Sequence, residues 1–147
     1  MQISVATTVD ASPERVFAVA TAIPRWPEVI RGIGRVEILT PGAVAMGTRF
    51  RETRVMYGRE ATEEMTVAEL DPPKSFVLTA ENHGTRYRAE HTFVPDGRGT
   101  RLTMTFSGKP VTLLARLFMP LGLLMAGSLK RTLEADLADL KRAAERD

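Results

Sequence analysis

The sequence predicts a single α+β domain, in which an antiparallel sheet of about seven strands surrounds one long C-terminal helix. The chain has 147 residues, which is the usual size of one domain. Short stretches of alternating apolar residues, separated by turn residues, occupy much of the first 110 positions. From residue 111 the apolar residues follow steps of three and four, which is the period of a helix. We therefore treat residues 1–147 as one domain.

The N-terminal segment predicts one strand followed by two short helices. Over residues 3–9, apolar residues alternate with small or polar ones, so a strand with one apolar face is expected. Ser12 is a good N-cap, and Pro13 suits the first position of a helix. Pro24 and Pro27 cannot continue that helix, so a second short helix is expected to begin near Pro27.

Six further strands are expected in the middle of the chain. Clusters of Gly, Pro, Asn and Asp separate them and supply the backbone conformations that reversals need. The connections are too short for helical crossovers, so neighbouring strands should be antiparallel. The expected strands span residues 34–40, 48–57, 59–70, 75–81, 85–94 and 100–107.

The last third of the chain predicts a long, amphipathic helix that Pro120 kinks. In its second half, Asp136 and Asp139 are expected to lie off the leucine stripe, on the solvated face. Residues 111–129 are apolar enough to raise the question of a membrane span. Arg116 and Pro120 argue against a span, peripheral membrane contact stays open, and a buried helix is the preferred interpretation. The apolar excess over residues 113–124 also predicts a homodimer face.

Composition excludes several classes of function. The 20 cationic and 18 anionic side chains alternate without a basic block, so a nucleic-acid partner is not expected. The chain has no cysteine, which excludes disulfides and thiol nucleophiles, and with only His83 and His91 neither a metal site nor a cofactor is expected. The N-terminus does not resemble a signal peptide, so a cytoplasmic location is expected. No phosphate-binding loop or nucleophile elbow occurs.

Several short strings carry a resemblance to a known family through their order and spacing. They are residues 11–17 (ASPERVF), 26–29 (WPEV), 47–51 (GTRFR), 70–73 (LDPP), 91–95 (HTFVP), 99–103 (GTRLT) and 136–141 (DLADLK). With these strings the whole chain is similar to the START-like (SRPBCC) superfamily, and in particular to its bacterial polyketide cyclase/dehydrase-like branch. The resemblance implies the helix-grip fold, in which a curved sheet encloses a cavity against the long helix. It also implies an apolar ligand, such as a lipid, sterol or polyketide, and some members catalyse cyclisation or dehydration.

Strand alternation selects the side chains that would face this cavity. In the strand at 48–57, the phase with Phe50 and Met56 is the better inward choice, and it turns Glu52 and Arg54 inward as well. In the C-terminal helix, Leu117, Leu121 and Met125 are one turn apart and are expected to close the cavity. The expected ligand-binding residues are Trp26, Phe50, Glu52, Arg54, Met56, Glu63, Met65, Tyr87, His91, Phe93, Met104, Phe106, Leu117, Leu121 and Met125.

The charged members of this set allow two interpretations. A buried charge is costly unless it is paired. Glu52, Arg54 and Glu63 either form the polar end of the pocket, where Arg54 would hold a ligand carboxylate or enolate, or pair with one another at half-solvated strand ends.

The aromatic and histidine candidates are equally open. His91 and Tyr87 share a strand face, and they either act as a general acid/base pair on a ligand carbonyl or are core side chains satisfied by neighbours. Trp26 either lines the pocket mouth or plugs the short helices against the sheet.

Three functions remain after these observations. The first is a binding or carrier protein for an apolar or amphipathic small molecule. The second is a cyclase or dehydratase, for which Arg54, Tyr87 and His91 are the candidate catalytic residues. The third is a protein-interaction module that uses spare apolar helix surface.

Overall fold

The computed structural model describes residues 1–56 and 58–146. In chain order its elements are β1 (Gln2–Val9), α1 (Pro13–Thr21), the 3₁₀ helix η1 (Ile23–Arg25), α2 (Trp26–Val29), β2 (Ile33–Ile38), β3 (Arg49–Met56), β4 (Arg59–Asp71), β5 (Ser75–Asn82), β6 (Thr85–Asp96), β7 (Gly99–Pro110), α3 (Leu113–Leu117), α4 (Met119–Leu124) and α5 (Ala126–Glu145). The expected end of one strand at Tyr57 lies outside the described residues.

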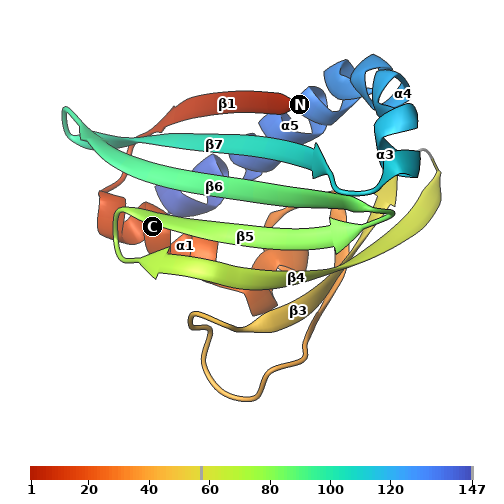
Figure 1. Ribbon diagram of the computed structural model, residues 1–147. Helices are drawn as coiled ribbons and strands as arrows, with labels where there is room; N and C mark the ends of the chain where they lie inside the picture. Colours follow the sequence, from red (N-terminus) through yellow and green to blue (C-terminus); the bar gives the residue numbers. More distant parts are fainter. Residues whose placement is uncertain (57, 147) are drawn as a thin grey trace.

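One antiparallel seven-stranded sheet forms the framework, with the strand order β1-β7-β6-β5-β4-β3-β2. Strands β2 to β7 pair with their neighbours in sequence, while β1 pairs with β7 at the edge. Register shifts interrupt the ladder between Ile33 and Arg35 and between Val67 and Glu69. Such bulges bend a sheet. The sheet curves in front of α5 (Figure 1), and the predicted α+β class and helix-grip layout are confirmed.

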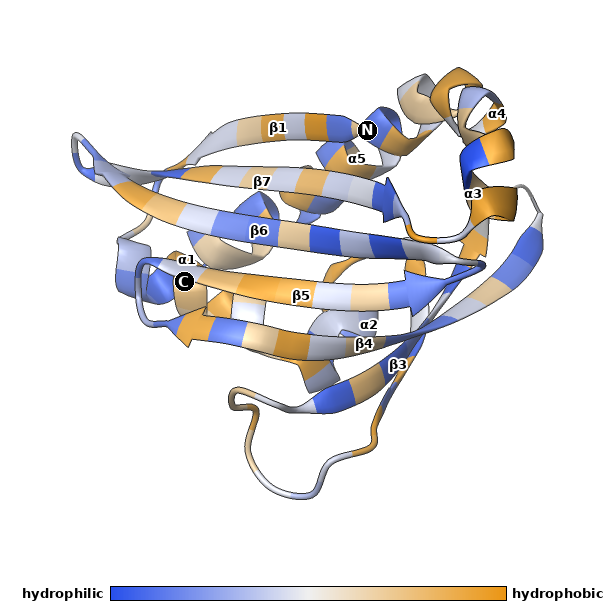
Figure 2. Ribbon diagram, viewed as in Figure 1, coloured by the Kyte–Doolittle hydropathy of each residue, from blue (hydrophilic) through white to orange (hydrophobic). Residues whose placement is uncertain are grey.

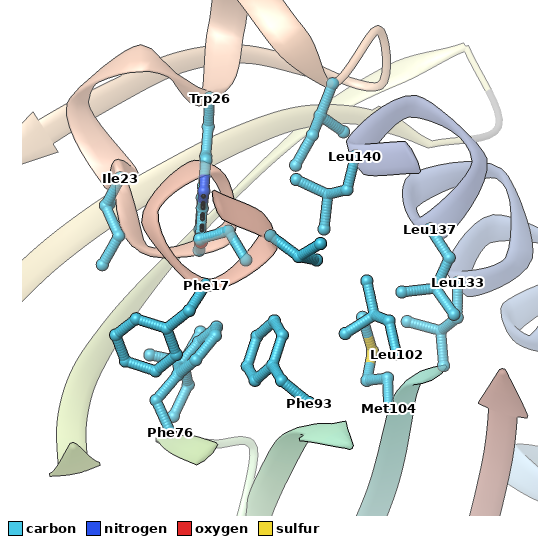
Figure 3. Close-up of a cluster of buried hydrophobic side chains, with 14 of the residues drawn as sticks. Phe17, Ile23, Trp26, Phe76, Phe93, Leu102, Met104, Leu133, Leu137 and Leu140 are labelled. Carbon is cyan, nitrogen blue, oxygen red and sulfur yellow. Dashed lines mark hydrogen bonds between the residues drawn. The ribbon is translucent and has the colours of Figure 1, made fainter. Parts of the chain in front are cut away.

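The short helices α1, η1 and α2 form as their capping residues predict. The Ser12 hydroxyl accepts a hydrogen bond from the Arg15 backbone amide at 3.2 Å, and Pro13 occupies the first helical turn. The Trp26 indole nitrogen donates to the Ala20 carbonyl at 3.1 Å, which fixes α2 against α1 (Figure 3). These helices therefore form a rigid unit at one side of the sheet's concave face.

The hydrophobic core lies between the sheet, the short helices and α5 (Figure 3). Phe17 from α1 packs edge-on against Phe76 and Phe93, with ring centroids 6.1 and 5.2 Å away. From the other side, α5 contributes Leu137, which is fully buried, and Leu140. The burial of this cluster stabilises the fold and holds α5 on the sheet.

The structure divides the predicted long helix into α3, α4 and α5, and it overturns the expectation that the leucine-rich segment is buried. The Val111 amide donates to the Gly84 carbonyl at 2.8 Å, so the chain leaves β7 at the turn between β5 and β6. Helices α3 and α4 consequently lie beyond the end of the sheet (Figure 1), and Figure 2 shows their hydrophobic colouring. With little of the core beneath them, their large apolar side chains stay exposed, Leu124 by 83% and Leu113 by 77%. Among the described helices, none is both long and apolar enough to cross a membrane.

Candidate functional site

A cavity of about 300 Å³ lies between the concave face of the sheet and α5. Apolar side chains form most of its wall, namely Ala20, Trp26, Ile30, Ile33, Ala61, Met65, Leu78, Ala80, Ala89, Met104, Phe106, Leu129, Leu133 and Leu140. The polar members are Glu52, Arg54, Glu63, Thr79, Tyr87, His91, Thr132 and Asp136.

Most of the sequence-predicted site residues lie in this wall. The strand phases were assigned correctly, so β3, β4, β6 and β7 each turn the expected side chains inward. The members of the predicted set in the wall are Trp26, Glu52, Arg54, Glu63, Met65, Tyr87, His91, Met104 and Phe106. The side chain of Met56 lies outside the described part of the structure.

Two predicted pocket residues, Phe50 and Phe93, belong instead to the core behind the wall. Phe93 is 2% exposed and packs between Phe17 and Phe76. Phe50 is fully buried, with its ring 5.6 Å from that of Trp26. Both rings face the concave side as alternation predicts, but the helices packed on that side cover them.

The prediction that Leu117, Leu121 and Met125 close the cavity was wrong. These side chains are exposed on or next to α3 and α4, because this segment leaves the sheet before it can cover the concave face. Leu129 and Leu133 of α5 occupy the expected place instead. Leucines of a C-terminal helix do line the cavity as predicted, but they belong to α5 and not to the segment before it.

Arg54 lies at the centre of a buried ion cluster at the polar end of the cavity. Its Nε donates to Glu52 Oε1 at 2.8 Å, and its Nη1 and Nη2 donate to the two carboxylate oxygens of Asp136 at 3.2 and 2.9 Å. All three side chains are at most 15% exposed. Three of the five N–H groups of Arg54 are thus already used within the protein.

Burial is the largest influence on the carboxyl groups of this cluster. It raises the pKa of Glu52 and the pKa of Asp136, although the charge of Arg54 acts in the opposite direction. Burial also tends to lower the pKa of Arg54, but its hydrogen bonds to Asp136 and the nearby charges outweigh this and raise that pKa. Arg54 therefore stays charged. For Glu52 and Asp136, the positive charge of Arg54 offsets only part of the cost of burying a carboxylate.

Glu63 lies beside this cluster on the neighbouring strand. It faces Glu52 directly in the β3–β4 register, which brings the Cβ atoms of such pairs within about 5 Å. Its carboxylate accepts a hydrogen bond from Asn82 Nδ2 at 3.1 Å. Of the two interpretations of these charges, mutual pairing holds for Glu52 and Arg54, whereas Glu63 adds a further carboxylate to the wall.

Sequence reasoning missed Asp136 and Asp139, which are buried and not on the solvated face of α5. The Asp139 carboxylate accepts hydrogen bonds from the backbone amide of Arg31 at 2.9 Å and from Arg31 Nε at 3.2 Å. It also forms an ion pair with Arg142. Spacing was an available signal, because Asp136 is three residues after Leu133 and four before Leu140.

His91 is a buried imidazole in the cavity wall. It is 5% exposed and stacks on Phe76, with ring centroids 4.2 Å apart and planes inclined by 7°. Burial lowers its pKa to about 4, so the ring is neutral near pH 7. Its Nδ1 atom is buried and has no hydrogen-bond partner among the described residues. A buried polar atom without a partner is uncommon and calls for an explanation.

Tyr87 lines the same cavity as His91 but lies further along β6. Both point inward from β6 and Tyr87 stacks on Phe106, with ring centroids 5.6 Å apart. However, four residues of strand separate Tyr87 from His91, which is about 13 Å along the chain. Their joint action on one ligand carbonyl therefore stays a prediction.

Trp26 has the packing of a structural plug and also lines the cavity, while its place at the pocket mouth stays a prediction. Its ring is 6% exposed, packs on Phe50 and is fixed by the hydrogen bond to Ala20, as a structural plug would be. It also contributes to the cavity wall. In the described ranges 1–56 and 58–146, no group of three His, Asp or Glu side chains could hold a metal ion.

Solved structures with the same fold include proteins described as aromatase/cyclase or ARO/CYC. The Zhui aromatase/cyclase from Streptomyces sp. R1128 superposes with a TM-score of 0.80 at 18% identity, over 99% of this chain and 94% of that chain. The di-domain ARO/CYC protein BexL gives 0.81 at 17%, over 100% of this chain and 50% of that chain. TTHA0849 from Thermus thermophilus gives 0.77 at 19%, over 98% and 97%. At such identities the likeness shows the fold alone.

Sequence comparison identifies the family directly. A search of curated protein sequences finds no match. The family model described as "Polyketide cyclase / dehydrase and lipid transport" matches residues 1–145. This match confirms the resemblance drawn from the short strings, and it spans every element from β1 to α5. The chain therefore belongs to the polyketide cyclase/dehydrase and lipid transport family.

Proposed function

We propose that this protein binds an apolar or amphipathic small molecule, lipid-like or polyketide-like, between the sheet and α5. The observation that carries the proposal is the cavity of about 300 Å³, whose wall is mostly apolar and has a few polar groups at defined places. Small-molecule sites have this composition, and they are usually formed before the ligand arrives.

Trp26 provides a direct test, because it is the only tryptophan and lies in the cavity wall. Titration with 1-methylnaphthalene, followed by calorimetry and by Trp26 emission, should give saturable binding. Ala89→Phe places a ring inside the cavity and should abolish this binding. Ala6→Phe is the matched control, because Ala6 is an exposed strand residue. If Ala89→Phe binds as tightly as the natural protein, the cavity is not the site.

Catalysis by the same cavity is the second candidate function, and His91 is the observation that favours it. A neutral imidazole with a free ring nitrogen can accept or donate a proton. Arg54 is a weaker candidate, since it is engaged by Glu52 and Asp136. For a cyclase or dehydratase, His91→Ala should abolish turnover of a polyketide-type substrate and leave its affinity nearly unchanged, and Tyr87→Phe tests the other end. Equal losses of binding and turnover would assign these side chains to positioning.

Three statements about partners and location extend this proposal. A nucleic-acid partner is not expected, because the arginines of β3 are paired. Arg49 pairs with Glu64 and Arg51 with Glu37, both at 3.4 Å. The exposed apolar side chains of α3 and α4 suit a homodimer face. The same surface is the one that a protein-interaction module would use. A cytoplasmic location stays a prediction.

A further inference from the structure

The charges in the cavity wall are unevenly distributed. Glu52, Glu63 and Asp136 contribute carboxylates to the wall, and among its described side chains only Arg54 carries a permanent positive charge. His91 adds none near pH 7, because its imidazole is neutral. At the polar end of the cavity, acidic side chains therefore outnumber permanently cationic ones by three to one.

Arg54 is largely engaged within the protein and is a poor anion receptor. Its Nε and both terminal nitrogens donate to Glu52 and Asp136, in part through a bidentate pair. A ligand carboxylate could use only the two remaining N–H groups, and its charge would share one guanidinium with those of Glu52 and Asp136. It would also lie close to the carboxylates of Glu52 and Glu63, which face each other across β3 and β4. Like charges in a site of low polarity repel strongly.

A second observation points to a ligand at the same cavity. His91 Nδ1 is buried in the wall and has no hydrogen-bond partner among the described residues. The wall around it is largely apolar, with Met104 opposite on β7, and Phe76 stacks on the imidazole from behind the wall. A polar group on a bound molecule would satisfy this atom, and an unsatisfied one is costly.

We infer that the natural ligand is an apolar molecule whose polar groups are hydrogen-bond donors, an amine or hydroxyl, and that the cavity discriminates against carboxylates. The inference rests on the proposed function and names its ligand class. It replaces the expectation that Arg54 holds a ligand acid. A donor placed at the Glu52–Glu63 pair would also relieve the repulsion between these two side chains.

Four ligands with a shared ring test the inference. They are 1-methylnaphthalene, 1-naphthylmethanol, 1-naphthylmethylamine and 1-naphthoate, each titrated by calorimetry at pH 7.5. We expect the amine and the alcohol to bind at least about tenfold more tightly than naphthoate. Naphthoate binding as tightly as the amine would overturn the ligand class while the cavity proposal stands. If methylnaphthalene and the other three all fail to bind, the proposed function itself fails.

Glu63→Gln locates the discrimination within the cavity. Its side-chain oxygen can still accept from Asn82, so the local structure should be kept. We expect the preference for amine over naphthoate to fall several-fold. Glu64→Gln is the matched control, because it removes the same charge from the next residue, which is exposed and pairs with Arg49. An equal change in both variants would overturn the inference, since it would assign the preference to overall charge.

Discussion

At the scale of single residues, the stability of the fold should be sensitive to changes in the buried cluster of Glu52, Arg54 and Asp136. Arg54→Met should lower the free energy of unfolding by about 3–5 kcal/mol, because it leaves two carboxylates buried without their partner. Urea unfolding at pH 7 measures this loss. The loss should shrink as pH falls, because the raised pKa values of Glu52 and Asp136 make both carboxyl groups neutral at a higher pH than ordinary carboxyl groups.

A matched control for this prediction is Arg88→Met. Arg88 pairs with Glu69 at 2.9 Å and with Glu90 at 3.7 Å, but its side chain is 48% exposed. Exposed ion pairs contribute about 0–1 kcal/mol, so this variant should unfold almost as the natural protein does. Equal losses for both arginines would contradict the buried cluster as described.

His91 predicts a specific pH dependence of stability. Its pKa is about 4 in the folded protein and near 6.5 in the unfolded chain, so the unfolded chain binds the proton first as pH falls. The folded state should therefore lose up to about 3 kcal/mol between pH 6.5 and pH 4 through this residue. His91→Gln removes this contribution, and the raised pKa values of Glu52 and Asp136 act equally in both proteins. Parallel curves of unfolding free energy against pH for the two proteins would contradict the buried neutral imidazole.

At the scale of elements, the start of α3 depends on a glycine in the β5–β6 turn. Gly84 has φ of +73°, and a Cβ there would lie 2.4 Å from Thr112 Oγ1, the atom that caps α3. Gly84→Ala should cost roughly 1 kcal/mol for the backbone and about 1 kcal/mol more for the displaced cap. Gly97→Ala is the control, since Gly97 has φ of +61° but no atom within 4 Å of its Cβ position.

Hydrogen exchange separates the two glycine variants. The collision with Thr112 should speed amide exchange in α3 and α4, whereas Gly97→Ala should leave exchange there unchanged. Equal exchange in the two variants would show that Thr112 moves aside without loosening α3.

The elements themselves were largely predictable, because turn residues and alternation are local properties of the sequence. The strand at 75–81 corresponds to β5 within one residue at its C-terminal end, and the inward phase of β3 was correct. The position of the apolar helices α3 and α4 relative to the sheet was not predictable in the same way. Periodicity in 113–124 indicates a helix, but the turn at Gly84 decides where that helix lies, and this contact is long-range.

The candidate site was predictable on the strands and not on the helix. A strand has two faces, so Phe50 selected the phase that also brought Glu52 and Arg54 inward. Because Asp136 is charged, it was predicted to face solvent. Its spacing of three residues from Leu133 would have placed it on the buried stripe, where the structure has it. The missing information was the pairing of Asp136 in α5 with Arg54 in β3, because these residues are far apart in the sequence.

At the scale of the whole molecule, the exposed apolar surface of α3 and α4 predicts self-association. Leu117 is 71% exposed and Phe118 60%, and monomeric proteins rarely expose such side chains together. Light scattering during size-exclusion chromatography should detect a dimer whose proportion rises with protein concentration. The double variant Leu117→Glu and Leu124→Glu should be monomeric. Val94→Glu, at an exposed apolar position of β6, is the control and should still dimerise.

The charges around this face give the association a distinctive dependence on salt. Within residues 105–133 every charged side chain is cationic, namely Lys109, Arg116, Lys130 and Arg131. A two-fold contact brings these cations towards their own copies, so repulsion weakens the dimer and screening relieves it. The dissociation constant of the dimer should therefore fall as sodium chloride rises from about 0.05 to 0.5 M. A chain that stays monomeric throughout, but binds anionic phospholipid vesicles less tightly as salt rises, would assign this face to a lipid surface instead.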